Sequence, residues 1–294
     1  MQKLLFHEPG LAKDMAKPPK GQLLKWIGNK QRFARKIVSF FPDNFSTYYE
    51  PFLGSGAVLG TLAKDGSVGA DSFKPLAEIW QTLALSPDTL KQWYQDRWRL
   101  TVEQGKREAY EAIKRSYNSQ PNAPDLLFLS RSCYGGVVRF RQADGYMSTP
   151  CGIHTPISPE AFARRVDEWH ARIKNATFLH AEYEDTMGRA QRGDLIYCDP
   201  PYSHTQSILY GAQSFSLERL FEVIRNCKSR GVFVALSIDG LKRSGRLRCS
   251  LPPADGLFER EVFLDCGRSM LKRFQMNGAT LEDEVVHDRL LLTY

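Results

Sequence analysis

Cysteine pairs of the kind that hold metals are missing from this sequence of 294 residues. Its six cysteines include no C-x-x-C pair, which argues against a structural zinc site, and no other metal is expected. We therefore interpret them as free thiols in a reducing cytoplasm. Cys198 belongs to an apolar run and is interpreted as core packing, not as a nucleophile.

Long apolar stretches are also missing. No apolar run approaches the ~20 residues that a membrane-spanning helix needs, so no membrane association is expected. Residues 1–21 lack an apolar core of about 7–15 residues, so no secretory signal is expected, and they predict a loose tail. Repeats and low-complexity tracts are absent, and the hydrophobic content of 42% is that of a globular protein.

Negative charge is outweighed by positive charge. The net charge is +7 and the isoelectric point is about 9.0, which indicates a polyanionic partner. Arg97 and Arg99 are interpreted as part of a solvated helix face. One later run has four cations and no acid, and it predicts a loop that contacts phosphates. These four cations are Lys242, Arg243, Arg246 and Arg248.

The tetrapeptide Asp199-Pro200-Pro201-Tyr202 follows the apolar run Leu195–Cys198, which is typical of a buried parallel strand. Open α/β sheets bind ligands at the carboxyl ends of their strands, so the tetrapeptide is expected at a binding edge. The Asp199 carboxylate and the Pro200 carbonyl can accept both N–H bonds of an exocyclic amine. Tyr202 can stack on the ring that carries the amine. The alternative is a proline-stiffened surface turn.

A strand that runs into a glycine-rich turn forms a second motif. Gly54 and Gly56 permit positive φ and let a ligand approach the backbone closely. The next strand ends in Asp71, which is placed to bind ribose hydroxyls. The dinucleotide pattern G-x-G-x-x-G is absent because Gly60 comes one residue late, which disfavours a dehydrogenase. The motif predicts a nucleoside cofactor over the turn.

A third segment contains Trp26 and Lys30, which can form one wall of a site; Lys30 suits a carboxylate as a compact point charge. Taken alone, this segment is better interpreted as an ordinary loop before a helix.

In combination, the motifs resemble the Dam-like (D12 class) DNA adenine-N6 methyltransferases. That family has a Lys-Trp-x-Gly-x-Lys segment, Glu-Pro-Phe-x-Gly-x-Gly, a target-recognition region and Asp-Pro-Pro-Tyr. This chain has all four in that order, from about residue 21 to its C-terminus. The resemblance implies methyl transfer from S-adenosylmethionine to the N6 amine of a flipped-out adenine in a specific double-stranded DNA sequence. It assigns catalysis to Asp199, Pro200 and Tyr202, and cofactor binding to Trp26, Lys30, Glu50, Phe52, Gly54, Gly56, Asp71 and Asp199.

A stretch before the Asp-Pro-Pro-Tyr motif resembles the family's DNA-contacting segment. Tyr134 matches an aromatic residue that enters the duplex near the target, and Arg139 matches an arginine that contacts DNA and can bind guanine bidentately. Ser130, Gly135 and Ser148 stand where the family usually has Asn, so its common target GATC is a candidate and not an assignment. The expected partner is double-stranded DNA bound by a monomer, and a separately acting restriction endonuclease is a candidate partner.

Strands alternate with helices, which predicts an α/β fold with a mainly parallel, doubly wound (Rossmann-like methyltransferase) sheet. The interval between the glycine turn and the tetrapeptide leaves room for an inserted smaller, mostly helical DNA-recognition domain. The expected parts are 1–84 and 161–294 for the catalytic domain and 85–160 for target recognition, with a DNA-reading hairpin. The expected strands are 47–52, 68–71, 177–180, 195–198 and 232–238, then an antiparallel pair, 261–264 with 290–294. The expected helices are 31–41, 87–117, 158–175 and 216–230.

Other functions stay open at this point. An N4-cytosine DNA methyltransferase uses the same amine chemistry, but its motif more often begins with Ser than with the Asp found at 199. RNA and protein-amide methyltransferases usually have Asn at this position. A catalytically silent nucleic-acid-binding subunit would have no need for both Asp199 and Tyr202.

Overall fold

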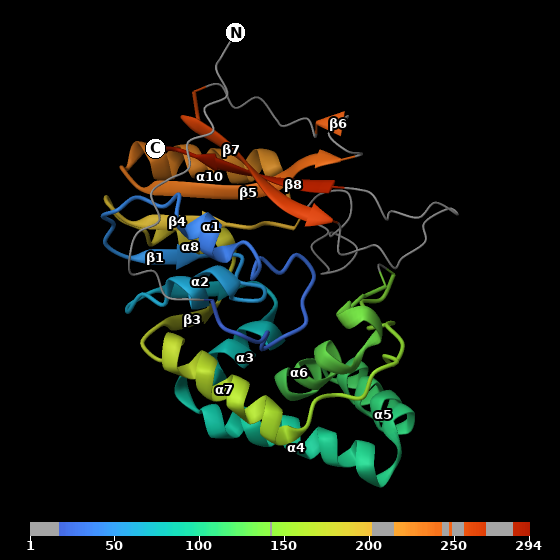
Figure 1. The fold of residues 1–294 in the computed structure, drawn as a ribbon. Coiled ribbons are helices and arrows are strands. Elements are labelled where there is room, and N and C mark those ends of the chain that lie inside the picture. Colours follow the sequence, from blue (N-terminus) through green and yellow to red (C-terminus); the bar gives the residue numbers. More distant parts are fainter. Residues whose placement is uncertain (1–17, 142, 202–214, 243–246, 249–255, 269–284) are drawn as a thin grey trace.

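The computed structural model describes residues 18–141, 143–201, 215–242, 247–248, 256–268 and 285–294. Its centre is a mixed β-sheet with the strand order β3-β2-β1-β4-β5-β8-β7, and β6 pairs with β5 (Figure 1). The strands are β1 (Tyr48–Glu50), β2 (Val68–Asp71), β3 (Thr177–His180), β4 (Leu195–Cys198), β5 (Phe233–Lys242), β6 (Leu247–Arg248), β7 (Arg260–Arg268) and β8 (Val285–Leu292).

The parallel half of the sheet has the predicted doubly wound arrangement. β1 pairs in parallel with β2 and with β4, while β2 pairs with β3 and β4 pairs with β5 in the same sense. From β1 the chain continues to β2 and β3 on one side of β1, and it then crosses to β4 on the other side of β1. Open α/β sheets bind ligands at such a switch point, beyond the carboxyl ends of the strands.

The other end of the sheet is antiparallel. β8 pairs with both β5 and β7 in antiparallel fashion, which confirms the closing pair predicted from the sequence. β5 runs as far as Lys242, and Leu241 stands opposite Arg248 of β6. The cationic run expected as a loop therefore begins and ends in paired strands.

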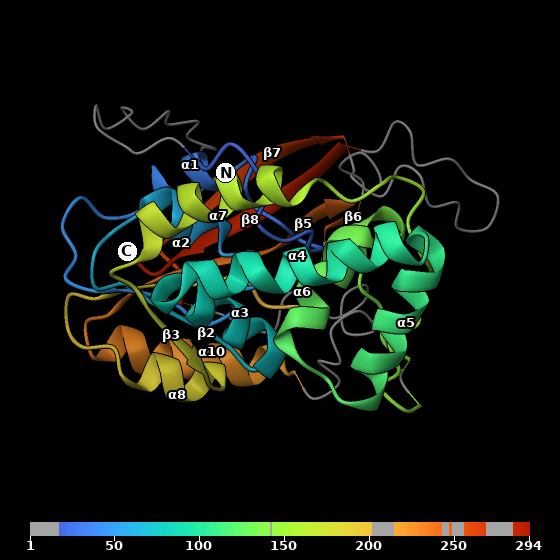
Figure 2. The ribbon, with the colours of Figure 1, turned by 90° about the horizontal axis from the view of Figure 1, so that it is seen from below.

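The central strand β4 is buried on both faces, which explains its continuous apolar run. In β4, Leu195 and Tyr197 pack into one core cluster, and Ile196 and Cys198 pack into the other. Cys198 is fully buried, in agreement with its interpretation as a packing residue. Figure 2 shows α1, α2 and α7 on one side of the sheet and α8 and α10 on the other. The helices around the sheet are α1 (Ala34–Val38), α2 (Ala57–Leu62), α3 (Lys74–Leu85), α7 (Pro159–Ile173), α8 (Tyr183–Gly188) and α10 (Leu217–Ser229).

Two helices have serine caps at the first residues of their predicted ranges, Ser158 and Ser216. The Ser158 hydroxyl accepts the Ala161 N–H at 3.3 Å, and the Ser216 hydroxyl accepts the Arg219 N–H at 3.1 Å. Each bond satisfies a backbone donor that the first helical turn leaves without an intrahelical acceptor. Within the described ranges, no helix has the combined length and apolar character needed to cross a membrane.

The segment predicted as one helix, 87–117, contains two. α4 (Pro87–Glu103) ends before Gly105, and α5 (Lys106–Ser119) begins after it, because Gly105 has a φ of 87° that interrupts the helix. α6 (Ala123–Ser132) follows. These helices share the core of the sheet's helical layer, since Tyr94 of α4 stacks on Phe162 of α7 at 4.0 Å.

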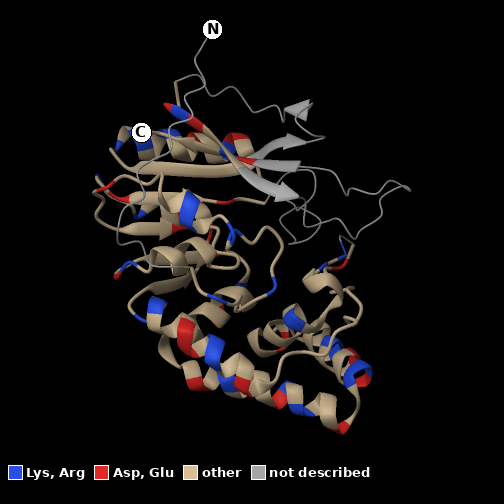
Figure 3. Ribbon diagram, viewed as in Figure 1, with Lys and Arg blue, Asp and Glu red and all other residues tan. Residues whose placement is uncertain are grey.

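Charged residues of both signs alternate along α4, α5 and α7 (Figure 3). Arg97 Nε lies 2.7 Å from Asp125 Oδ1, and Arg99 Nε lies 3.4 Å from Glu103 Oε1. Arg99 is 67% exposed, as expected for a solvated helix face, whereas the Arg97 side chain is 21% exposed and pairs with the buried Asp125 of α6.

Candidate active site

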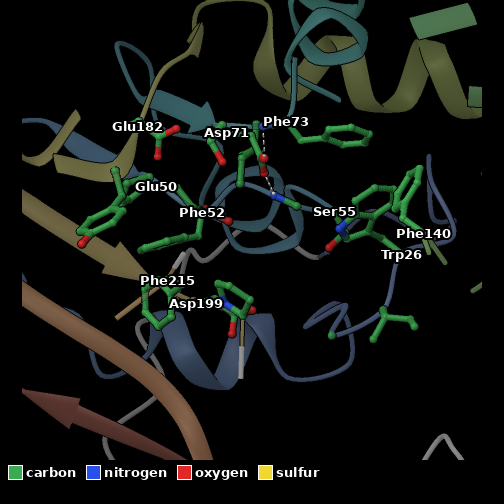
Figure 4. A pocket seen from close by; sticks show the side chains of 18 of the residues that line it. Trp26, Glu50, Phe52, Ser55, Asp71, Phe73, Phe140, Glu182, Asp199 and Phe215 are labelled. Carbon is green, nitrogen blue, oxygen red and sulfur yellow. Dashed lines mark hydrogen bonds between the residues drawn. The ribbon is translucent and has the colours of Figure 1, made fainter. Parts of the chain in front are cut away.

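A pocket of about 840 Å³ opens at the switch point of the sheet (Figure 4). Its walls come from the segments after β1, β2, β3 and β4, from the loop before α1, and from the hairpin that follows α6. Most of the residues predicted to bind the cofactor line it: Trp26, Lys30, Glu50, Phe52, Gly54, Asp71 and Asp199. Gly56 and Pro200 stand beside lining residues in the chain, and Tyr202 lies outside the described residues.

Asp199 follows β4 directly and contacts a buried lysine. Lys30 Nζ lies 3.3 Å from Asp199 Oδ1 and 2.8 Å from Asp288 Oδ2. The sequence predicted Lys30 as a partner for a cofactor carboxylate, and in the structure it pairs with two carboxylates of the chain itself. Asp288 was not predicted as a site residue.

The glycine turn has the backbone conformation that the sequence predicted. Gly54 and Gly56 have φ values of 48° and 60°, in the left-handed region that favours glycine. A Cβ at Gly56 would lie 2.8 Å from the ring of Trp80, so the close packing of Trp80 also requires glycine there. The Trp80 indole N–H donates to the Gly54 carbonyl at 3.0 Å, which fixes the turn from below.

Asp71 ties the turn to the end of β2. Its Oδ2 accepts the Gly54 N–H and its Oδ1 accepts the Phe73 N–H, each at 3.0 Å. Burial raises the pKa of Asp71 to about 6, although both backbone N–H groups act to lower it; nearby Glu182 raises it further. The carboxylate is therefore ionised for the most part at neutral pH, and each of its oxygens has already accepted one bond.

Glu50, at the end of β1, is 3% exposed. Its Oε2 accepts the Tyr48 hydroxyl at 2.7 Å. Burial raises the pKa of Glu50 to about 8, the Tyr48 hydrogen bond opposes that rise, and the Asp199 charge adds to it. At neutral pH the Glu50 carboxyl is therefore mostly protonated, so it can donate as well as accept.

Aromatic rings form two walls of the pocket. On one side Phe52 stacks on Tyr183 at 5.1 Å, and Phe215 meets Phe52 edge-on at 5.9 Å. On the other side Phe73 lies 6.3 Å from Trp26 and 5.6 Å from Phe140 of the hairpin. Figure 4 shows Trp26 and Phe140 across the pocket from Phe215.

Sequence reasoning missed Glu182, Tyr183 and Phe215. A signal existed for the first two, because they follow β3 and the carboxyl ends of parallel strands share one edge.

A hairpin is present within the predicted range 85–160, and it is firmly anchored. Phe140 and Met147 form an antiparallel bridge. The Asn118 side chain of α5 accepts the Met147 N–H at 2.7 Å and donates to the Met147 carbonyl at 3.1 Å. Tyr134 is 38% exposed and Arg139 is exposed, so both can reach a partner.

Two further residues of the hairpin, Gly135 and Arg141, have structural roles that account for their identity. Gly135 has a φ of 65°, a conformation that Asn also tolerates, so glycine can replace the family's Asn without a change of backbone. Arg141 binds Asp144 through two nitrogens, at 3.1 and 2.7 Å, and lies over the Tyr146 ring at 4.2 Å. Arg141 thus stabilises the hairpin tip.

The structure describes little of the predicted cationic run. Arg243 and Arg246 lie outside the described residues. For Lys242 and Arg248 it gives the backbone, in β5 and β6. Among the described residues, no group of three or more His, Cys, Asp or Glu side chains could hold a metal ion.

The model of the D12 class N6 adenine-specific DNA methyltransferase family matches residues 26–264. The retron Ec67 DNA adenine methylase of Escherichia coli is 30% identical over 63% of this chain and 65% of its own length. The DNA adenine methylase of Vibrio cholerae is 26% identical over 76% of this chain and 83% of its own length, and that of Serratia marcescens is 29% identical over 66% and 73%. The matched range includes the pocket and the hairpin. This chain therefore belongs to the family of D12 class N6 adenine-specific DNA methyltransferases.

Proposed function

We propose that this protein transfers a methyl group from S-adenosylmethionine to the N6 amine of a flipped-out adenine in double-stranded DNA. One observation carries the proposal: Asp199, the glycine turn and Asp71 line a single pocket at the switch point. The family match supports adenine as the methylated base.

The charge of the pocket suits S-adenosylmethionine. Asp71, Glu182 and Asp199 place carboxyl groups around it. The lining cations Lys30 and Arg219 are already paired with carboxylates of the chain, Lys30 with Asp199 and Arg219 with Glu184. S-Adenosylmethionine carries a sulfonium and an ammonium group, which carboxylates and aromatic rings attract. A phosphate-bearing cofactor would instead meet negative charge.

The residues present fit the rest of the cofactor. A carboxylate oxygen has two lone pairs, so Asp71 can accept ribose hydroxyls beyond the two N–H bonds it already accepts. Phe52, Tyr183 and Phe215 would contact the adenine ring of the cofactor. Trp26 would contact its amino-acid end, and Lys30 would line that end while it stays paired with Asp288 and Asp199.

The transfer itself is a task of positioning. Bound S-adenosylmethionine would supply a methyl group on a sulfonium. The Asp199 carboxylate and the Pro200 carbonyl would accept the N–H bonds of the target amine and direct its lone pair toward the methyl group. Positive charge grows on that nitrogen in the transition state, so an acceptor there stabilises the transition state more than the ground state. The proton can leave after transfer, so Asp199 need not act as a base.

DNA would be bound by the hairpin and the cationic run. An adenine within a duplex cannot reach the pocket, so it must leave the stack, and we propose that Tyr202 stacks on it. Tyr134 would enter the duplex near the target and Arg139 would contact a base, within a target-recognition region of 85–160. Lys242, Arg243, Arg246 and Arg248 would contact phosphates.

A transfer assay tests the proposal. Purified protein is incubated with duplex DNA and S-adenosylmethionine labelled in the methyl group, and the product is digested to nucleosides and separated. We expect the label in N6-methyldeoxyadenosine. Asp199→Ala should reduce the rate of labelling by at least about a hundredfold. Label in N4-methyldeoxycytidine or in protein, or equal rates for wild type and Asp199→Ala, would refute it.

A further inference from the structure

Lys30 is held between two carboxylates of the chain. Its Nζ lies 2.8 Å from Asp288 Oδ2 and 3.3 Å from Asp199 Oδ1. The side chains are 7% exposed for Lys30, 11% for Asp288 and 19% for Asp199. The closer contact is thus to the more buried carboxylate. One cation shared by two anions leaves a net negative charge at the pocket floor.

Asp288 reaches this cluster from a distant part of the sheet. It belongs to β8, where it stands opposite Asp239 of β5 and Leu264 of β7, so strands on both sides fix its backbone. It is separated from Lys30 by 258 positions in the chain. Lys30 and Asp199 are among the described residues that line the pocket, and Asp288 is not. Among the described contacts, Asp288 is linked to the pocket through Lys30.

We propose that Asp288 is a positioning residue for methyl transfer, which orients Asp199 and tunes its charge through Lys30. The proposal rests on the proposed role of Asp199. Without Asp288, the ammonium group of Lys30 would close on Asp199 and occupy lone pairs that the target amine needs. With Asp288 present, the Lys30 ammonium lies closer to Asp288 Oδ2, at 2.8 Å, than to Asp199 Oδ1, at 3.3 Å.

The charge of Asp288 matters as well as its position. The developing positive charge on the amine nitrogen is stabilised by the negative charge of Asp199. Lys30 reduces that negative potential, and Asp288 offsets Lys30. Removal of the Asp288 charge therefore weakens stabilisation of the transition state and leaves ground-state binding nearly unchanged.

The first test is the isosteric change Asp288→Asn. We expect kcat to fall by at least about tenfold, less than for loss of a direct transition-state contact. Because Asp288 does not line the pocket, Kd for S-adenosylhomocysteine and KM for DNA should change less than about twofold. If Asp288→Asn does not fold, Asp288→Ser, whose smaller hydroxyl is easier to satisfy, is measured in the same way. An unchanged kcat, or a rise of KM and Kd equal to the loss of kcat, would overturn the proposal.

A neighbouring ion pair supplies the matched control. Arg289 Nε lies 2.6 Å from Glu261 Oε1, and Arg289 is the next residue on β8, so its side chain points to the opposite face of the sheet. Glu261 and Arg289 are not among the described residues that line the pocket. Glu261→Gln should therefore lower the melting temperature but leave kcat within about twofold of wild type. If Glu261→Gln lowers kcat as much as Asp288→Asn, the loss reflects the stability of β8 and the positioning role fails.

A double-mutant cycle identifies the route of the effect. If Asp288 acts through Lys30, Asp288→Asn should slow transfer in the wild-type background and have no further effect on kcat in a Lys30→Met background. Equal rate losses in both backgrounds would overturn the route through Lys30. Asp199→Ala, measured in the same assay, distinguishes failure of the Asp288 proposal from failure of the proposed function. An active Asp199→Ala would refute the proposed function itself.

Discussion

The buried Glu50 makes the stability of the protein depend on pH in a way that one substitution should remove. The pKa of Glu50 is raised from the ordinary value of 4.5 to about 8, chiefly by burial. A raised folded-state pKa gives stability that is fully present below the unfolded pKa and is lost as pH rises through the folded pKa. Linkage with these values predicts a loss of roughly 4 kcal/mol between about pH 5 and 9, most of it below pH 7.

Glu50→Gln keeps the shape of the protonated carboxyl and can still accept the Tyr48 hydroxyl bond. It should therefore be less destabilised than the wild type as pH rises. Urea unfolding of both proteins at about pH 5, 7 and 9 gives the difference, in which the contributions of all other titrating groups cancel. A difference that stays constant within about 0.5 kcal/mol across this range would refute the assignment of a protonated Glu50.

Three further changes test the site. Asp199→Ala should keep Kd for S-adenosylhomocysteine within a few-fold and slow single-turnover transfer by at least about a hundredfold; near-wild-type turnover would mean that another group meets the amine. Asp71→Ala removes the acceptor of the Gly54 and Phe73 N–H bonds and the proposed acceptor of the ribose hydroxyls. Because a hydrogen bond to a charged group contributes about 1.5–3 kcal/mol, the affinity for S-adenosylhomocysteine should fall at least about tenfold in calorimetric titration, while the affinity for DNA is kept. Arg139→Ala should relax preference at one base pair by about 1–3 kcal/mol, measured by competition between duplexes; undiminished selectivity would remove the hairpin as the reader.

The sequence predicts the parallel half of the sheet well, for a physical reason. The bounds of β2, β3 and β4 agree with the predicted runs. For β4 the reason is that a strand buried on both faces must be continuously apolar, and the polar Asp199 ends it. Gly105 shows where this reasoning is insufficient. Periodicity continues through 87–117, but a glycine with positive φ divides α4 from α5, and its conformation depends on how those helices pack.

Site residues could be predicted where a sequence motif stands at the carboxyl end of a predicted strand, as for Asp71 and Asp199. Asp288 could not be found in this way, because its contact with Lys30 depends on β8 lying between β5 and β7, and local sequence does not specify that order. Glu182 was predictable only in part. The end of β3 was predicted, but no motif distinguished the second residue after it from its neighbours.

The most direct measurement of the central claim is the modification state of DNA in cells that express the protein. DNA from cells with the wild type and with Asp199→Ala is sequenced by a method that reads methylated bases directly, in a host without other adenine methylation. We predict N6-methyladenine at one short recognition sequence with the wild type, and unmethylated sites with Asp199→Ala. Expression of the folded wild type without N6-methyladenine, or with methylcytosine in its place, would contradict the account.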